Sequence, residues 1–284
     1  MTNKEDPQAS APIIYGVALS TPAGVVDRLA DALTRYRKRK GTRWRAYEVR
    51  VQAVLTLAWL EGGHTWRSLG AGNGVPKSTC RDMVTEGVKV LARRALPLTE
   101  VIGLARKAGW LYLIVDGVNI PTERVAARWG KVQYWYSGKH RRHGAAVQTV
   151  AAPDGELLWV SGVLPGRTVD VTSARRFKIA EKVVAFLGLL ADLGYIGLHP
   201  EVVVGYKRKR GEKVLPEGKK SANQVLAGLR SIGERANAQL KGWRVLAMDF
   251  RGKPRQLTAV VKAVQTLQYW IRDSFGTDRA VTGS

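Results

Sequence analysis

The sequence is poor in cysteine and histidine, which excludes several kinds of site. Its 284 residues include one cysteine, Cys80, and 4 histidines. A single thiol excludes an internal disulfide framework and any multi-cysteine zinc site, and it fits a reducing cytoplasm. The chain lacks an apolar run near the ~20 residues that a transmembrane helix requires. Its polar opening also predicts no secretory signal, so we expect no membrane partner.

Acidic residues are scarce as well, and the chain is strongly basic. It has 23 Asp and Glu against 46 Lys and Arg, which leaves a formal charge of +23. This charge exceeds what solubility requires, so the expected partner is a polyanion. Nucleic acid fits best, because no membrane-spanning run accompanies the charge. We therefore expect a cytoplasmic, nucleoid-associated protein.

Helical periodicity dominates the N-terminal third of the chain. We expect a mobile tail at residues 1–24 and a helical DNA-binding module at residues 25–100. Within this module a short helix predicted at 65–70, with Thr65 as its N-cap, precedes a Gly-rich turn and a longer helix predicted at 78–95. This is a helix-turn-helix pattern, in which the start of the second helix reads a DNA major groove. The predicted DNA-contacting residues there are Lys77, Ser78, Thr79 and Arg81.

A pattern of predicted strands and helices begins after a domain boundary that we predict near residues 97–108. The apolar run LYLIV predicts a strand, and strands predicted at 144–151 and 156–163 are joined by the hairpin-turn sequence Pro-Asp-Gly. Next come a helix predicted at 171–189, short strands at 187–192 and 201–204, and helices at 222–240 and 255–271. This order predicts an α/β catalytic domain with a mixed sheet at 108–273, followed by a tail at 274–284.

Two of the few acidic residues end predicted strands. Asp116 ends the run LYLIVD, and Asp192 ends LGLLAD. If these strands are neighbours, their carboxylates meet at one edge of the sheet and can bind metal ions. Glu234 is a third candidate, because at about 100° per residue it lies opposite the apolar stripe of its helix, in line with Arg230 and Asn237.

Asp170, just before a predicted helix, is a fourth candidate. Each carboxylate has a structural alternative when it is taken singly: an aspartate after a strand often forms a turn, Asp170 could cap its helix, and Glu234 could be a solvated helix residue. Their combination in a basic α/β domain favours phosphodiester chemistry, for which two metal ions about 3.5–4 Å apart neutralise the phosphoryl group and activate the nucleophile. Hard oxygen ligands suit Mg²⁺ or Mn²⁺. The predicted metal ligands are Asp116, Asp170, Asp192 and Glu234.

Two basic clusters accompany these carboxylates. The first precedes a predicted strand, and contact with DNA phosphates and a solvated charge run explain it equally well. The second lies between Asp192 and Glu234, where we favour DNA contact. The residues that we expect to contact DNA are Lys139, Arg141 and Arg142 in the first cluster and Lys207, Arg208, Lys209 and Arg210 in the second.

Several strings around these residues resemble one known family. They are VDG at Asp116, YSGKHRRHGAAVQTV, PDGELLWVSGVLPG, TVD at Asp170, ADLGY at Asp192 and IGERANAQLKGWRVL at Glu234. In this order, over roughly residues 110–250, they resemble the insertion-sequence transposases related to Harbinger elements, which are DDE superfamily endonucleases. The resemblance implies an RNase H-like catalytic domain, Mg²⁺-dependent strand cleavage and transfer, and binding to the terminal inverted repeats of a mobile element. It matches Asp116, Asp192 and Glu234 to the catalytic DDE triad and Asp170 to a further acidic position.

Two alternative functions share much of this pattern. A non-catalytic or domesticated helix-turn-helix protein would bind DNA without metal dependence. A metal-dependent nuclease would use the same carboxylates without strand transfer, so only a product assay with a joinable target separates it from a transposase. Because transposition holds two ends together, we expect a homo-oligomer on double-stranded DNA, with transposon ends and target DNA as partners.

Overall fold

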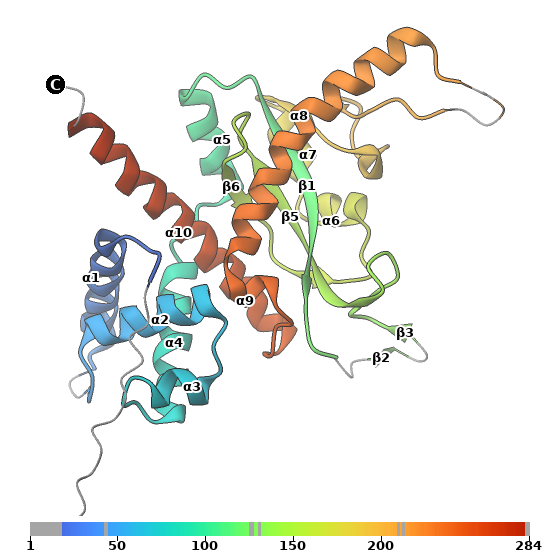
Figure 1. Ribbon diagram of the computed structural model, residues 1–284. Coiled ribbons are helices and arrows are strands. Elements are labelled where there is room, and N and C mark those ends of the chain that lie inside the picture. The colour runs from blue at the N-terminus through green and yellow to red at the C-terminus, as the bar shows by residue number, and fades with distance from the viewer. Residues whose placement is uncertain are drawn as a thin grey trace, which may run out of the picture.

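A computed structural model describes residues 19–42, 45–124, 128–129, 132–208, 211 and 214–281 of the chain. A helical N-terminal region lies beside an α/β region, and the long C-terminal helix α10 (Pro254–Val281) runs along both (Figure 1). No helix in the described ranges is long and apolar enough to cross a membrane.

The described residues of the N-terminal region form four helices: α1 (Ala23–Lys40), α2 (Val49–Gly62), α3 (Trp66–Ala71) and α4 (Lys77–Ala92). The last two correspond to the short and long helices predicted at 65–70 and 78–95. Thr65 caps α3 as predicted, since its Oγ1 accepts a hydrogen bond from the Ser68 N–H at 3.1 Å. Helices α2 and α4 cross closely at Gly87, where a β-carbon would lie 2.8 Å from Cγ2 of Thr56.

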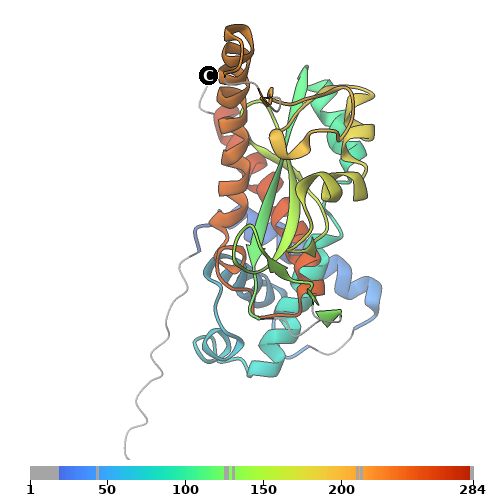
Figure 2. The same cartoon turned by 90° about the vertical axis from the view of Figure 1, so that its right-hand side faces the viewer.

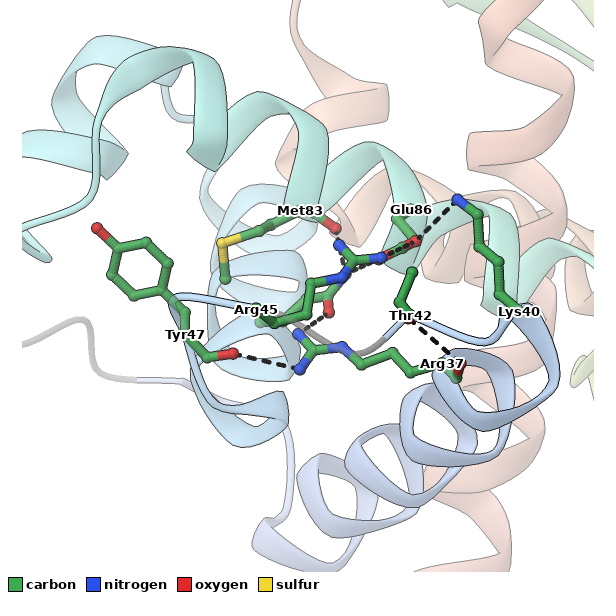
Figure 3. Close-up of polar contacts among 8 residues, drawn as sticks. Arg37, Lys40, Thr42, Arg45, Tyr47, Met83 and Glu86 are labelled. Atoms are coloured by element: carbon green, nitrogen blue, oxygen red, sulfur yellow. Dashed lines mark hydrogen bonds and ion pairs between the residues drawn. The ribbon is translucent and has the colours of Figure 1, made fainter.

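A polar network fastens α1 and α2 to α4 (Figure 3). The amide of the fully buried Gln52 donates to the Met83 carbonyl at 2.9 Å and to Glu86 at 3.0 Å, and its oxygen accepts from Arg37 at 2.7 Å. Arg45 donates to Glu86 at 2.9 Å. Burial alone would raise the pKa of Glu86, but the bonds from Gln52 and Arg45 outweigh it and lower that pKa. Glu86 is therefore held as a carboxylate between three helical segments.

The α/β region is built on a seven-stranded mixed sheet of order β4-β5-β1-β8-β9, with β6 and β7 also paired to β5. Strand β1 is antiparallel to β5 and parallel to β8, which is parallel to β9. This confirms the predicted α/β class with a mixed sheet. The strands are β1 (Tyr112–Pro121), β4 (Tyr136–Ser137), β5 (Arg142–Ala151), β6 (Leu157–Val160), β7 (Leu164–Pro165), β8 (Gly188–Leu190) and β9 (Val202–Val203), and a separate pair is formed by β2 (Arg128–Trp129) and β3 (Val132–Gln133).

Helices cover both faces of this sheet (Figure 2). Alternate side chains of β1 point to opposite faces: Ile114 and Val118 join the core beneath α8 and α10, whereas Leu113 and Val115 join the core beneath α5, α6 and α7. The helices of this region are α5 (Leu98–Lys107), α6 (Asp170–Arg176), α7 (Ile179–Val184), α8 (Glu217–Gly242), α9 (Arg244–Ala247) and α10 (Pro254–Val281), and η1 (Leu193–Tyr195) is a 3-10 turn.

The residues 97–108, near which the domain boundary is predicted, contain the helix α5. Its apolar face, with Leu98 and Val101 buried, packs on the sheet side of the core. The N-terminal helices and the sheet are also not independent, since α10 packs against both α4 and β6. One hydrophobic core consequently runs from α1 to α10.

Three further boundaries differ from the prediction. The helix predicted at 171–189 is two helices, because Lys178 between α6 and α7 has a φ of 52° in the left-handed region. The predicted tail 274–284 is largely helical, since α10 reaches Val281. The predicted tail 1–24 overlaps α1, which begins at Ala23, and its residues 1–18 lie outside the described part.

Candidate active site

The sequence predicts that Asp116 ends its strand. In the structure Asp116 lies in the middle of β1. Pairing with β5 carries β1 on to Pro121, whereas pairing with β8 stops at Ile114 and Leu190. Extending that parallel register by two residues would set Asp116 opposite Asp192. The predicted approach of these two aspartates therefore follows from the register of β1 and β8, at the point where the two strands separate.

Asp192 follows β8 and begins the turn η1. Its Oδ1 accepts a hydrogen bond from the Gly194 N–H at 2.8 Å, which fixes the carboxylate at the head of this turn. Its Oδ2 lies 3.9 Å from the guanidinium of Arg230 on α8, and the Asp192 side chain is 30% exposed. Asp192 is thus accessible and faces a cation on the neighbouring helix.

Asp170 is the first residue of α6 and lies beside Gly117. It makes no side-chain capping bond, and Val169 holds the N-cap position. Its Oδ2 instead lies 3.3 Å from Lys139 Nζ. A β-carbon at Gly117 would lie 2.7 Å from Asp170 Cγ and closer still to Oδ1. The missing side chain at Gly117 therefore makes room for Asp170 next to Asp116.

The three aspartates are close enough to influence one another. Burial is the largest cause that raises the pKa of Asp116, and the charges of Asp192 and Asp170 raise it further, against the opposing effects of the Gly117 N–H and Arg230. Carboxylates that repel one another in this way are stabilised by a nearby cation.

Tyr195 lies against the same group of aspartates from the interior. It is almost completely buried, and its hydroxyl donates to Gln148 Oε1 at 2.6 Å. Burial first, and then the charges of Asp170 and Asp116, raise the pKa of Tyr195 well above its usual value. Tyr195 therefore stays a neutral hydrogen-bond donor on the buried side of the aspartates.

Asn237 connects α8 directly to Asp116. Its Nδ2 donates to Asp116 Oδ2 at 2.8 Å, and its Oδ1 accepts from Thr149 Oγ1 at 2.8 Å. Thr149 lies on β5 opposite Asp116 in the strand register. One signal in the sequence points to Asn237, its alignment with Glu234 on a helix face, and that signal alone assigns it no role.

Glu234 lies on the same face of α8, one helical turn from both Arg230 and Asn237. These two neighbours reach Asp192 and Asp116, but Glu234 itself is exposed and makes no described hydrogen bond or ion pair. Within the described residues, no three Asp, Glu, His or Cys side chains lie close enough together to hold a metal ion. Asp116, Asp170 and Asp192 are therefore near enough to influence one another without forming a complete metal-binding group, and Glu234 lies on the helix face beside them.

The chemistry of these donors fits a hard divalent cation. Every candidate ligand is a carboxylate oxygen, the type that Mg²⁺ and Mn²⁺ prefer. Asp170 and Asp192 are 25% and 30% exposed, so an ion from solvent can reach them. Lys139 and Arg230 already neutralise part of the charge of these two carboxylates, a role that a bound metal ion would share.

The residues predicted to contact DNA from α4 occupy its first turns. Lys77, Ser78 and Arg81 are exposed there, and Thr79 is half-buried. Arg81 forms an ion pair with Asp82 at 3.0 Å. The start of this helix therefore offers polar and cationic side chains to solvent.

The other predicted contact residues lie on the α/β region. Lys139 pairs with Asp170, and Arg142 pairs with Asp249 at 2.5 Å. Arg141 is exposed next to them. In the second basic cluster Lys207 and Arg208 are exposed between β9 and α8, and Lys209 and Arg210 lie outside the described residues.

Comparison with known proteins identifies relatives of this region. Residues 115–268, more than half of the chain, match the family described as DDE superfamily endonuclease. The chain is 29% identical over 209 residues to the putative transposase for insertion sequence element IS112 of Streptomyces albus G, covering 73% of this chain and 74% of that protein. The family match includes Asp116, Asp170, Asp192 and Glu234.

Two solved structures are also similar over much of their length. The crystal structure of a pre-cleavage Mos1 transpososome is 9% identical, with a TM-score of 0.18, and covers 82% of this chain and 80% of that one. The Mos1 mariner paired end complex with Mn is 11% identical, with a TM-score of 0.18, and covers 91% and 88%. TM-scores this low do not indicate a shared architecture.

Proposed function

This chain belongs to the DDE superfamily endonucleases and is a DNA-cleaving enzyme of the transposase type, and we propose that it cleaves and transfers DNA strands at the terminal inverted repeats of a mobile element. The observation that carries this proposal is the approach of Asp116, Asp170 and Asp192 where β1 and β8 separate. This edge lies inside the matched residues 115–268.

Asp116, Asp192 and Glu234 are the proposed catalytic residues. Together with Asp170 they would hold Mg²⁺ or Mn²⁺. Such ions, when bound, neutralise charge on the phosphoryl group and activate a water or a 3′-hydroxyl. Glu234 would join the aspartates from α8, where it already lies between the two residues that contact them.

The protein's own hydrogen bonds fix the orientation of Asp116. One of its oxygens accepts from the Gly117 N–H at 2.8 Å, and the other accepts from Asn237 at 2.8 Å. A carboxylate held at both oxygens does not rotate freely, so its remaining lone pairs point in fixed directions. Asn237 is therefore a positioning residue for the proposed site.

Two cations beside the aspartates are proposed to receive DNA phosphates. Lys139 is 72% exposed and Arg230 is 34% exposed, and each contacts one carboxylate. A phosphodiester that enters the site offers both cations a new anionic partner. The exposed Arg141 and Arg142 would extend this contact along the strand, and Lys207, Arg208, Lys209 and Arg210 would neutralise the strand from the other side.

DNA recognition is assigned to the N-terminal helices. We infer that α3, its Gly-rich turn and α4 act as a helix-turn-helix, with Lys77, Ser78, Thr79 and Arg81 in the major groove of the inverted repeat. An RNase H-like fold of the α/β region is supported by the sheet, in which antiparallel β6, β5 and β1 continue into parallel β8 and β9. We further infer a homo-oligomer on DNA, acting in the cytoplasm at the nucleoid.

A cleavage and joining assay tests the proposed function. Labelled duplexes carrying the element's ends and a joinable target are incubated with Mg²⁺ or with EDTA. We expect metal-dependent cleavage and joining by the wild type, and DNA binding without cleavage by Asp116→Asn and Glu234→Gln. The matched control is Asp154→Asn, which changes an exposed carboxylate in the β5–β6 turn and should cleave normally.

The outcomes separate the alternative functions. Tight DNA binding without cleavage in either Mg²⁺ or Mn²⁺ would favour a non-catalytic DNA-binding protein. Cleavage without joined product would favour a nuclease. If both site variants cleave as the wild type does, Asp116 and Glu234 are not catalytic residues.

A further inference from the structure

Four arginines from two helices meet where the C-terminal ends of α1 and α4 come together. Arg35 and Arg39 belong to the last turns of α1, and Arg93 and Arg94 follow α4; these four residues are called the arginine cluster below. Arg39 and Arg93 lie 6.0 Å and 5.9 Å from the centre of the same Tyr36 ring. Residues far apart in sequence are thus folded into one cationic surface.

Like charges in this cluster act on one another. Burial is the first cause that lowers the pKa of Arg94, and the charges of Arg35 and Arg39 lower it further. Arg35, Arg39 and Arg93 are exposed, and Arg94 is half-buried with its guanidinium donating to the Val90 carbonyl at 2.6 Å. The fold therefore tolerates repulsion here that a bound anion would relieve.

The acidic side chains of the described chain do not pair directly with these arginines. None of the four arginines forms an ion pair within the described ranges. The carboxylate on α4 that faces α1, Glu86, is already engaged by Gln52 and Arg45, with Lys40 at 3.8 Å (Figure 3). The contacts in Figure 3 thus engage Glu86 with other partners, and no ion pair within the described ranges joins it to the arginine cluster.

Cations at helix C-termini also interact favourably with the helix dipole, which offers a purely structural explanation. That effect explains basic residues at each helix end separately. It does not explain why two such ends are packed together, because the interaction between them is repulsive. A polyanionic partner explains both the charge and its convergence.

We propose that the arginine cluster binds the phosphate backbone of double-stranded DNA, at a place distinct from the carboxylate site and from the start of α4. Guanidinium groups bind phosphate oxygens in a forked, bidentate geometry. The 16 residues of α4 span about 24 Å at about 1.5 Å per residue, so the cluster and Lys77 would contact phosphates separated along the duplex. The contact is independent of base sequence.

This inference rests on the proposed function, because it needs a protein that binds DNA. The test variant is Arg35→Gln, Arg39→Gln and Arg93→Gln in the full chain, with Arg94 kept because it is half-buried. The matched control removes the same charge from the α5–α7 side by Lys107→Gln, Arg176→Gln and Lys178→Asn, whose side chains are exposed and form no ion pair among the described residues.

The measurement is the dissociation constant for a short duplex of element-end sequence, by fluorescence anisotropy from about 50 to 300 mM KCl. Each phosphate contact contributes about 0.9 to the slope of log affinity against log salt. We expect the cluster variant to lose about 2 to 3 from this slope and to bind at least about tenfold more weakly at ~0.1 M salt, while the control loses less than about 1.

Three results would overturn the inference, and they are distinguishable. Equal slopes for the cluster variant and the control would refute the arginine cluster alone, with the proposed function intact. Loss of slope in the charge-preserving variant Arg35→Lys, Arg39→Lys and Arg93→Lys, with unchanged thermal unfolding, would show that charge is not the cause. A wild type that does not bind the duplex would refute the proposed function together with the cluster.

Discussion

A methyl group at Gly117 would test whether Asp170 must lie beside Asp116. Gly117 has no left-handed backbone conformation, so alanine is compatible with its main chain. The added carbon would lie 2.7 Å from Asp170 Cγ and 3.3 Å from Gln148 Nε2. Non-bonded carbons normally sit about 3.5–4.0 Å apart, so the Asp170 carboxylate must move by about 1 Å or more.

We expect Gly117→Ala to impair the reaction far more than the fold. A misplacement of about 1 Å at a catalytic site can cost about 100-fold in rate, and we predict a loss of that order in metal-dependent cleavage. Asp170 is 25% exposed and can turn toward solvent, so the change in unfolding free energy should stay below about 1 kcal/mol.

The assay combines single-turnover cleavage with thermal unfolding. The matched control is Gly103→Ala in α5, where a β-carbon meets nothing within 4 Å; it should cleave normally and gain about 0.5–1 kcal/mol in stability. Asp170→Ala should lose as much activity as Gly117→Ala, and the double variant should lose little more, because both act through one group. A folded Gly117→Ala protein that cleaves at the wild-type rate would refute this reasoning.

Three further predictions concern contacts inside the fold. Asn237→Ala removes one hydrogen bond from the half-buried Asp116 carboxylate and one from the Thr149 hydroxyl, so its unfolding free energy in urea should fall by about 1–3 kcal/mol; unchanged stability would contradict this contribution. Burial lowers the pKa of Lys262 to about 8 from 10.5, so its charged form destabilises the fold below pH ~8 and wild-type stability should rise by up to about 3 kcal/mol as pH increases from about 8 to 10.5. Lys262→Met should lack that rise in a pH series of thermal unfolding, and parallel curves would disprove the assignment. Gly87→Ala forces a β-carbon against a threonine of α2 and should cost about 1–3 kcal/mol, which a wild-type unfolding temperature would contradict.

Local signals in the sequence predicted the parts of the fold that depend on short-range chemistry. The β5–β6 hairpin was predicted from its Pro-Asp-Gly turn, and Gly155 there has a φ of 89°. The cap at Thr65 follows equally from local hydrogen bonding. These features need no knowledge of distant segments.

Other features depend on contacts that sequence periodicity does not contain. The apolar run predicts that Asp116 ends a strand, but the distant β5 pairs with β1 on to Pro121. The break between α6 and α7 places Lys178 in a conformation that lysine seldom adopts. The residue type at this position therefore does not predict the break. Asn237 contacts Asp116 across 121 residues of sequence. Its role depends on the packing of α8 against the sheet, which the sequence pattern does not predict.

The most direct test of the central claim is Mn²⁺ binding by the protein on a duplex of element-end sequence, followed by electron paramagnetic resonance of the free ion. We predict that the wild type and the turn variant Asp154→Asn bind Mn²⁺, and that Asp116→Asn combined with Asp192→Asn binds at least about tenfold more weakly. Equal Mn²⁺ binding by all three proteins would contradict a metal site at the edge where β1 and β8 separate.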